Sequence, residues 1–230
     1  VNFLDYTRHQ DKVILLYTFS TVKCRLNKYS ITLIDDNTNN PSLEYLDLYG
    51  NRIGIIGSKA LGQNLPNLSL LKELNLSGNQ IDDEAITYLS KGIAKHSALK
   101  KVCLGFNNIS NRGAEILAVE CLGCNNEHLD SLNLHNNPNI GELGTRALIQ
   151  RGLACNYFLK EMNIDWVRGA DQLLLEEMNM YLELNRGGRS TLRDEVLEPF
   201  AWSEIFREVS MLSSVYHLVR FCPEMCEFNI

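Results

Sequence analysis

The sequence predicts an α/β solenoid, in which short strands and helices alternate along the chain, with a helical cap at its C-terminal end. Two observations predict this fold. The chain repeats itself at a period of 28 residues, and within each repeat the apolar spacing changes from strand-like to helix-like. Because one such unit cannot bury its own apolar face, the units are expected to stack and share a single core.

The repeat has the pattern L-x-x-L-x-L-x-x-N-x-I. Three copies align without gaps, a fourth follows after 30 residues with one extra residue inside the pattern, and a fifth follows after another 30 and lacks the asparagine. We therefore expect about five units. Their first leucines are Leu43, Leu71, Leu99, Leu129 and Leu159.

Each unit is expected to begin with a strand. The second and third apolar positions, such as Leu46 and Leu48, alternate with polar residues, and this period of two points them into the core. The asparagine follows where the chain leaves the strand. Its side-chain amide can donate to and accept from main-chain groups that would otherwise be buried without a partner, so the stacked units should form an asparagine ladder.

A helix is expected after each strand. In the second unit Ala85, Ile86, Leu89 and Ile93 lie on one helical stripe, and the third and fourth units carry similar stripes. Asp82 and Ser110 precede these stripes and are expected to be N-caps. Small residues recur early in the helices, where we expect a close approach to the sheet: Gly57, Ala85, Gly113 and Gly144.

This pattern resembles the ribonuclease-inhibitor-like class of leucine-rich repeats over roughly residues 30–166. The resemblance implies a right-handed arc with the parallel sheet on its concave side and the helices on its convex side, a shape generally used to recognise proteins. The segment Leu184–Arg189 and the tryptophan-containing helical stripe that follows are similar to those of uncharacterised leucine-rich-repeat proteins from diatoms and related algae.

Three segments are expected along the chain. Residues 1–42 form an N-terminal flank with a degenerate repeat or cap, residues 43–166 hold the repeats, and residues 167–230 form a helical C-terminal cap. In the flank, Val13–Phe19 is a candidate capping strand, because the end of a solenoid exposes an unpaired edge. In the cap, a helical stripe runs from Leu173 to Leu182 and ends at Gly187, and a second runs from Trp202 to Val219.

Composition and charge exclude several classes of protein. The formal net charge is −6 and no basic stripe is visible, which argues against nucleic acid as a partner. No apolar run approaches the roughly 20 residues that a transmembrane helix needs, so membrane insertion is not expected. Seven irregularly spaced cysteines favour reduced thiols and an intracellular, cytoplasmic location, although a chain that begins at Val1 leaves open a preceding targeting segment.

Catalytic and cofactor motifs are missing from the sequence. The five histidines are scattered without metal-ligand spacing, and no phosphate-binding glycine loop occurs. Cys121 and Cys124 form a single C-x-x-C pair at the end of a predicted helix, where buried core thiols are favoured over zinc or redox chemistry. We therefore expect neither an enzyme nor a bound cofactor or metal.

The outward strand positions are the candidate binding surface, because exposed aromatic side chains on a rigid sheet are typical of recognition sites. For Phe106 and Trp166 the alternative is packing against the turn or the cap. Asp47, Asn75, Asn133 and Asn163 form a polar row, and the alternative for this row is simple solvation. The candidate contact residues are Tyr45, Asp47, Tyr49, Glu73, Asn75, Lys101, Phe106, Asn133, His135, Glu161, Asn163, Asp165 and Trp166.

The function predicted from these features is a non-enzymatic module that binds a partner protein on its concave face. One alternative is a structural subunit of a larger complex that docks through the acidic C-terminal helices. A more distant alternative is a regulator or inhibitor of an enzyme. The sequence does not identify the partner.

Overall fold

The computed structural model describes residues 3–5, 21–25, 43–123, 126–165 and 172–187. Its main feature is a parallel sheet of seven strands whose order in space equals their order in the chain. The strands are β1 (Phe3–Asp5), β2 (Thr21–Arg25), β3 (Tyr45–Asp47), β4 (Glu73–Asn75), β5 (Lys101–Cys103), β6 (Ser131–Asn133) and β7 (Glu161–Asn163).

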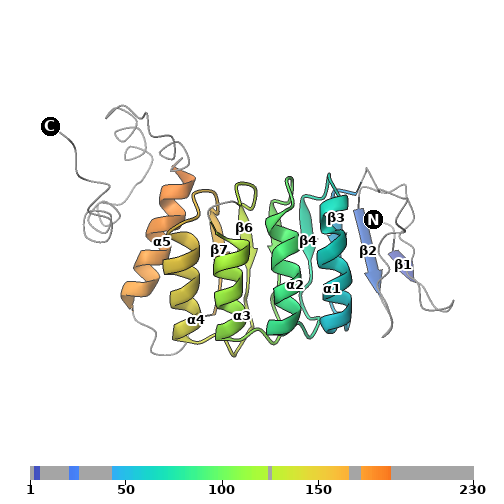
Figure 1. The fold of residues 1–230 in the computed structure, drawn as a ribbon, viewed down its shortest axis with the longest axis horizontal. Helices are drawn as coiled ribbons and strands as arrows, with labels where there is room; N and C mark the ends of the chain where they lie inside the picture. The colour runs from blue at the N-terminus through green and yellow to red at the C-terminus, as the bar shows by residue number, and fades with distance from the viewer. Residues whose placement is uncertain (1–2, 6–20, 26–42, 124–125, 166–171, 188–230) are drawn as a thin grey trace.

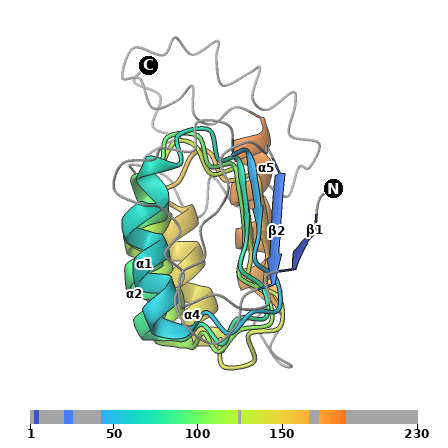
Figure 2. The ribbon, with the colours of Figure 1, turned by 90° about the vertical axis from the view of Figure 1, so that its right-hand side faces the viewer.

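Helices form a second layer on one side of this sheet. Figure 1 shows the helices side by side, and the end-on view in Figure 2 shows α1, α2 and α4 separated from the strands. No described helix is long and apolar enough to cross a membrane. The helical segments are α1 (Gly54–Asn64), η1 (Leu65–Asn67), α2 (Asp83–Ala94), α3 (Asn111–Ile116), η2 (Leu117–Cys121), α4 (Glu142–Ala147), η3 (Leu148–Leu153) and α5 (Gln172–Arg186).

The predicted repeats are confirmed by the register of the strands. Leu46 pairs with Leu74, and the same position continues through Val102, Leu132 and Met162. All five side chains are buried, and they belong to one apolar cluster that runs through every unit. Stacking therefore buries leucines that a single unit would leave exposed.

Two strands of the sheet, β1 and β2, lie in the N-terminal flank at positions that the sequence pattern did not indicate. β2 pairs in parallel with β3, and β1 pairs with β2. Paired residues lie 20 positions apart between β1 and β2 and 24 apart between β2 and β3, whereas β3 and β4 are offset by 28. A search at a fixed period misses such shortened units. The predicted strand Val13–Phe19 lies outside the described residues.

The predicted asparagine ladder is present on the turns after β3 to β6, at Asn51, Asn79, Asn107 and Asn137. The Nδ2 of Asn79 donates to the carbonyl of Leu76 in its own unit and to that of Leu48 in the preceding unit, both at 2.9 Å. Asn107 repeats this with Leu104 and Leu76. The Oδ1 of Asn107 also accepts from the main-chain N–H groups of Asn79 and Ile81, at 2.9 and 3.1 Å. Each asparagine thus joins two units while it satisfies buried main-chain groups.

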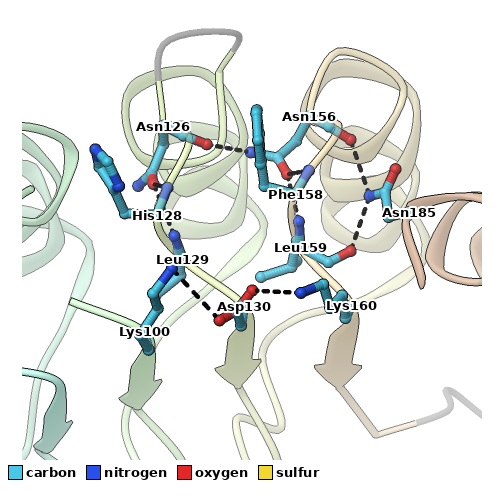
Figure 3. A network of polar contacts seen from close by, with 10 residues as sticks. All are labelled: Lys100, Asn126, His128, Leu129, Asp130, Asn156, Phe158, Leu159, Lys160 and Asn185. Carbon is cyan, nitrogen blue, oxygen red and sulfur yellow. Dashed lines mark hydrogen bonds and ion pairs between the residues drawn. The ribbon is translucent and has the colours of Figure 1, made fainter. Parts of the chain in front are cut away.

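A second polar ladder, which the sequence analysis missed, lies in the loops before the strands. Asn126 and Asn156 each stand three residues before the first leucine of their units, and the Oδ1 of each accepts two main-chain N–H bonds. The Nδ2 of Asn156 donates to the carbonyls of Leu122 and Asn126, at 2.8 and 3.0 Å. Figure 3 shows Asn126, Asn156 and Asn185 in one row along the loops.

His96 takes the place of asparagine in the second ladder. Its Nδ1 accepts from the N–H groups of Ala98 and Leu99, at 3.1 and 3.0 Å. The proton must therefore be on Nε2, which lies 2.9 Å from the carbonyl oxygen of Leu68 and donates to it. The neutral ring is thus the form that fits this position.

The helices of neighbouring units are joined at their N-terminal ends. The predicted N-caps are confirmed: Asp82 accepts from the N–H of Ala85 at 3.0 Å, and Ser110 accepts from that of Arg112 at 3.2 Å. Asp83 reaches forward and accepts from the N–H of Gly113 at 3.0 Å. A Cβ at Gly113 would lie 2.4 Å from that carboxylate oxygen. This glycine therefore makes room for the preceding helix, where we had expected an approach to the sheet.

α5 caps the C-terminal end of the solenoid. It lies at the end opposite β1 in Figure 1 and on the strand side of the molecule in Figure 2. Its Met178 and Tyr181 join the common core, whereas Leu173, part of the predicted stripe, is exposed. The Nδ2 of Asn185 donates to the carbonyls of Asn156 and Leu159, at 3.0 and 2.8 Å, and so continues the second ladder. The predicted second cap helix lies outside the described residues, and the three segment boundaries stay predictions.

The ladder asparagines should differ in their contribution to stability. Asn79 and Asn107 both donate to three carbonyls, but only the Oδ1 of Asn107 has hydrogen-bond partners. We expect Asn107→Ala to lower the free energy of unfolding by about 2–4 kcal/mol, and Asn79→Ala by about 1–2 kcal/mol less, because buried N–H groups lose their acceptor in the first variant alone. Urea denaturation measures both, with the exposed Asn67→Ala as control. Equal losses would contradict this account.

His96 should make the fold sensitive to acid. Burial lowers the pKa of His96 below its ordinary value of 6.5, the neighbouring His128 lowers it further, and the hydrogen bond to the Leu68 carbonyl opposes both. The stability due to the neutral ring is complete above pH 6.5 and is lost as the pH falls through the lower folded pKa. His96→Asn introduces the residue that Asn126 and Asn156 supply in the two later loops, and the variant should lose less stability between about pH 7.5 and about pH 5. Urea denaturation of the wild type and the variant at both pH values tests this prediction. Equal losses of stability in the two proteins would refute it.

Candidate functional site

The concave face, defined here as the sheet surface turned away from α1–α4, gathers the predicted contact residues into rows. The strand register aligns Tyr45, Glu73, Lys101, Ser131 and Glu161 in a first row. It aligns Asp47, Asn75, Cys103, Asn133 and Asn163 in a second. The positions after the strands are Tyr49, Ser77, Gly105, His135 and Asp165. Trp166 lies outside the described residues.

The second row holds the ends of the strands in place. Asn75 donates from Nδ2 to the Oδ1 of Asp47 at 3.0 Å, and that oxygen also accepts from the N–H of Tyr49 at 3.0 Å. Asn133 accepts from the N–H of His135 at 2.9 Å in the same manner. Simple solvation was the alternative explanation for this polar row. Its hydrogen bonds instead stabilise the turns that carry the positions after the strands. The residues of this row mainly hold the candidate site in position, because their polar groups already take part in hydrogen bonds within the sheet.

Two aromatic side chains project from the turn end of the concave face. Tyr49 is 58% exposed and Phe106 is 54% exposed. Tyr45 is half-buried, and burial raises its pKa above 10.0 together with the neighbouring charges of Asp47 and Glu73. Aromatic groups held on rigid main chain supply binding energy at low conformational cost, so these side chains are suited to contact another protein.

Phe106 occupies a position with an unusual main-chain conformation. The equivalent residues in the first two units are Gly50 and Gly78, with φ of +69° and +71°, and in the fourth unit Asn136, with φ of +55°. Phe106 has φ of +56°. Left-handed main chain is easy for glycine and tolerated by asparagine, but it costs about 1–2 kcal/mol for most other residues. The third unit therefore carries strain at the point where it exposes an aromatic ring.

A small cluster supports the Phe106 ring. The ring packs edge-on against His135, with centroids 5.7 Å apart and an interplanar angle of 84°. Nδ1 of His135 pairs with Oδ1 of Asp165, whose other carboxylate oxygen accepts from the N–H of Asn136. Residues from three successive units thus hold one exposed aromatic ring in place. The sequence pattern places each of these residues on the outer side of its unit but does not predict that they touch.

Cys103 lies in the middle of the second row and is partly exposed. Burial raises the pKa of its thiol above 9.0, and the nearby carboxylates of Glu73 and Asp47 add to the effect against the opposing charge of Lys101. Cys121 is fully buried, which raises its pKa to about 12. These are weakly reactive thiols, since the thiolate is the nucleophilic form.

Within the described ranges, no group of three or more His, Cys, Asp or Glu residues is arranged to hold a metal ion. The charged residues at the start of the strands pair with one another instead. Lys72 contacts Glu44 at 2.8 Å, and Asp130 lies between Lys100 and Lys160 at 3.6 and 3.1 Å, as Figure 3 shows for the second group. These ion pairs form a charged border at the start of the strands.

The stacked strand–turn–helix units, the common leucine core and the asparagine ladder define the class of protein. The fold is a leucine-rich-repeat solenoid, with helices on its convex side. Such repeats generally form modules for protein–protein interaction and are generally not enzymes.

Comparisons with known proteins agree with this class. A family model described as leucine-rich repeats, in two copies, matches residues 41–91. Protein NLRC5 from Mus musculus is 37% identical over 78 residues, which make up 34% of this chain and 4% of that much longer protein. The solved structure of leiomodin-1 actin-binding site 2 is similar with a TM-score of 0.59 and 17% identity, over 67% of this chain and 87% of that one. This last likeness concerns the fold alone.

The strain at Phe106 predicts an unusual order of variant stabilities. Phe106→Gly removes the left-handed strain and the ring together, so we expect the free energy of unfolding to change by less than about 1 kcal/mol. Phe106→Ala loses the ring but keeps the strain, and it should be less stable than the glycine variant by about 1 kcal/mol. Urea denaturation compares the two. An alanine variant as stable as the glycine variant would show that the main chain there is not strained.

Proposed function

We propose that this chain is a protein-recognition module whose concave face binds a partner protein around Phe106, Tyr49 and Tyr45. The observation that carries the proposal is Phe106. Where other units have glycine or asparagine, this unit holds a half-exposed aromatic ring on left-handed main chain. Such a residue contributes little to stability, and strained residues concentrate at functional sites.

The surroundings of Phe106 support the same role. His135 and Asp165 fix the ring from one side, and Tyr49 stands exposed at the same end of the sheet two units away. A few anchored aromatic side chains within a polar surface supply most of the affinity in known interfaces. The short strands and their hydrogen-bonded turns keep these anchors rigid, so binding requires little ordering of the module.

Charge indicates the character of the partner. The outward positions from β3 to the turn after β7 carry four carboxylates, Asp47, Glu73, Glu161 and Asp165, and one lysine, Lys101. Electrostatic complementarity therefore favours a partner that offers basic side chains around an apolar pocket for Phe106. We infer an intracellular location as well, because Cys103 and Cys121 are free thiols and reducing compartments keep thiols in this form.

The test removes the aromatic anchors and follows binding and labelling together. Partners captured by the full chain from native cells should be lost when the bait carries Tyr49→Ala and Phe106→Gly, and the purified complex should weaken by at least about tenfold, because anchors dominate affinity. In the wild-type complex, the partner should slow maleimide alkylation of Cys103. Peptide mapping by mass spectrometry reads each cysteine separately.

Cys155 is the internal control, because it is partly exposed but lies after η3, away from the strand face. Its alkylation should stay unchanged in the complex. Unchanged affinity of the double variant, or equal protection of Cys103 and Cys155, would refute binding at the concave face.

A further inference from the structure

A groove runs along the convex side, between the helical segments of the third and fourth units. Its volume is about 440 Å³, and its walls come from α3, α4 and η3. Figure 1 shows α3 and α4 side by side. Leu143, at the start of α4, is 73% exposed on its border. The remaining lining residues are Asn111, Arg112, Glu115, Arg146, Ala147, Gln150 and Arg151.

The helices on either side of this groove differ from those of the earlier units. α3 and α4 both continue as π-helical turns, η2 and η3, whereas α1 ends in a 3-10 turn. π-helical turns take up inserted residues and are frequent at functional sites. By contrast, α1 and α2 touch through their main chains: a Cβ at Gly92 would lie 2.3 Å from the carbonyl oxygen of Gly62.

The groove is basic although the chain as a whole is acidic. Its lining contains three arginines and one glutamate, while the formal net charge of the chain is −6. Arg151 on η3 pairs across the groove with Glu115 on α3, and Arg146 pairs with Glu142 at 2.9 Å along its own helix. Arg112 forms no ion pair with any residue in the described ranges.

These ion pairs can be exchanged for a ligand. Both are formed by exposed side chains, and exposed pairs contribute at most about 1 kcal/mol. A carboxylate from another chain could thus replace Glu115 at Arg151 with little loss and also engage Arg112. Arginine suits this role because its planar group binds a carboxylate through two parallel hydrogen bonds.

We propose that the groove between α3–η2 and α4–η3 binds an acidic segment of a partner protein. Carboxylates of the segment pair with Arg112 and Arg151, and an apolar side chain packs on Leu143. The observation behind the proposal is charge complementarity at a formed groove with one exposed leucine. The site lies on the opposite side of the molecule from the concave face, so its test is independent of the function proposed above.

The experiment measures binding of a fluorescein-labelled peptide, Glu-Glu-Leu-Glu-Glu, to the full chain by fluorescence anisotropy at low ionic strength. The double variant Arg112→Glu, Arg151→Glu should bind at least about tenfold more weakly, because it replaces attraction by repulsion. Leu143→Ser should weaken binding about threefold, since it removes the apolar contact. Glu115→Gln should strengthen it about threefold, because Arg151 then loses its internal competitor.

Lys91→Glu is the control for charge reversal, since it reverses one charge, as each of the two groove substitutions does, at an exposed site on α2 outside the groove. It should leave the affinity within about twofold of wild type. Circular dichroism tests whether each variant is folded. If the double variant is not folded, the single variant Arg112→Gln takes its place. The proposal is wrong if Lys91→Glu weakens binding as much as the groove variants do, or if Glu115→Gln fails to strengthen it.

Discussion

The fold depends on one requirement: every main-chain N–H and C=O group left over where a strand ends must find a partner inside the stack. A buried side-chain amide meets this requirement because it donates and accepts at once. Asn107 does so in its own unit and in the preceding one, so the same bonds that close the turn also fix the distance between units. In the loops on the other side of the strands, Asn126, Asn156 and His96 solve the same problem. Leucines fill the space between these two ladders, and the ladders hold the units in register.

This arrangement places stability in the middle layer of the molecule. The buried leucines and the two ladders lie between the outward strand residues and the outward helix residues. Contacts between units are nearest-neighbour contacts, as expected for a solenoid. The end units then need special solutions. At the C-terminal end α5 supplies one, because its Asn185 binds the carbonyls of Asn156 and Leu159 although no strand follows it within the described chain.

The sequence predicts the parts of this structure that repeat. The leucine frame, the first asparagine ladder and the caps Asp82 and Ser110 follow from local patterns, because the same physical demand returns every 28 to 30 residues. The sequence does not predict β1 and β2, since their units are shorter, nor the second ladder, where Leu68 and His96 interrupt the row of asparagines. Most candidate residues of the concave face follow from alternation along the strands, and Phe106 follows from its aromatic side chain at a strand end. Their mutual contacts, such as that of Phe106 with His135, depend on the turn geometry and could not be predicted.

The departures from the repeat are therefore the informative positions for function. A residue that recurs in each unit is explained by stacking, whereas a residue that breaks the rule without gaining stability requires another explanation. His96 breaks the rule of its ladder but satisfies the same main-chain groups, so it is explained by the fold. Phe106 replaces glycine, strains the main chain and exposes half of its ring, and Leu143 exposes an apolar side chain beside three arginines. Neither is explained by stacking. They lie on opposite surfaces of a layer that is stable without them, which leaves each surface free to acquire its own partner.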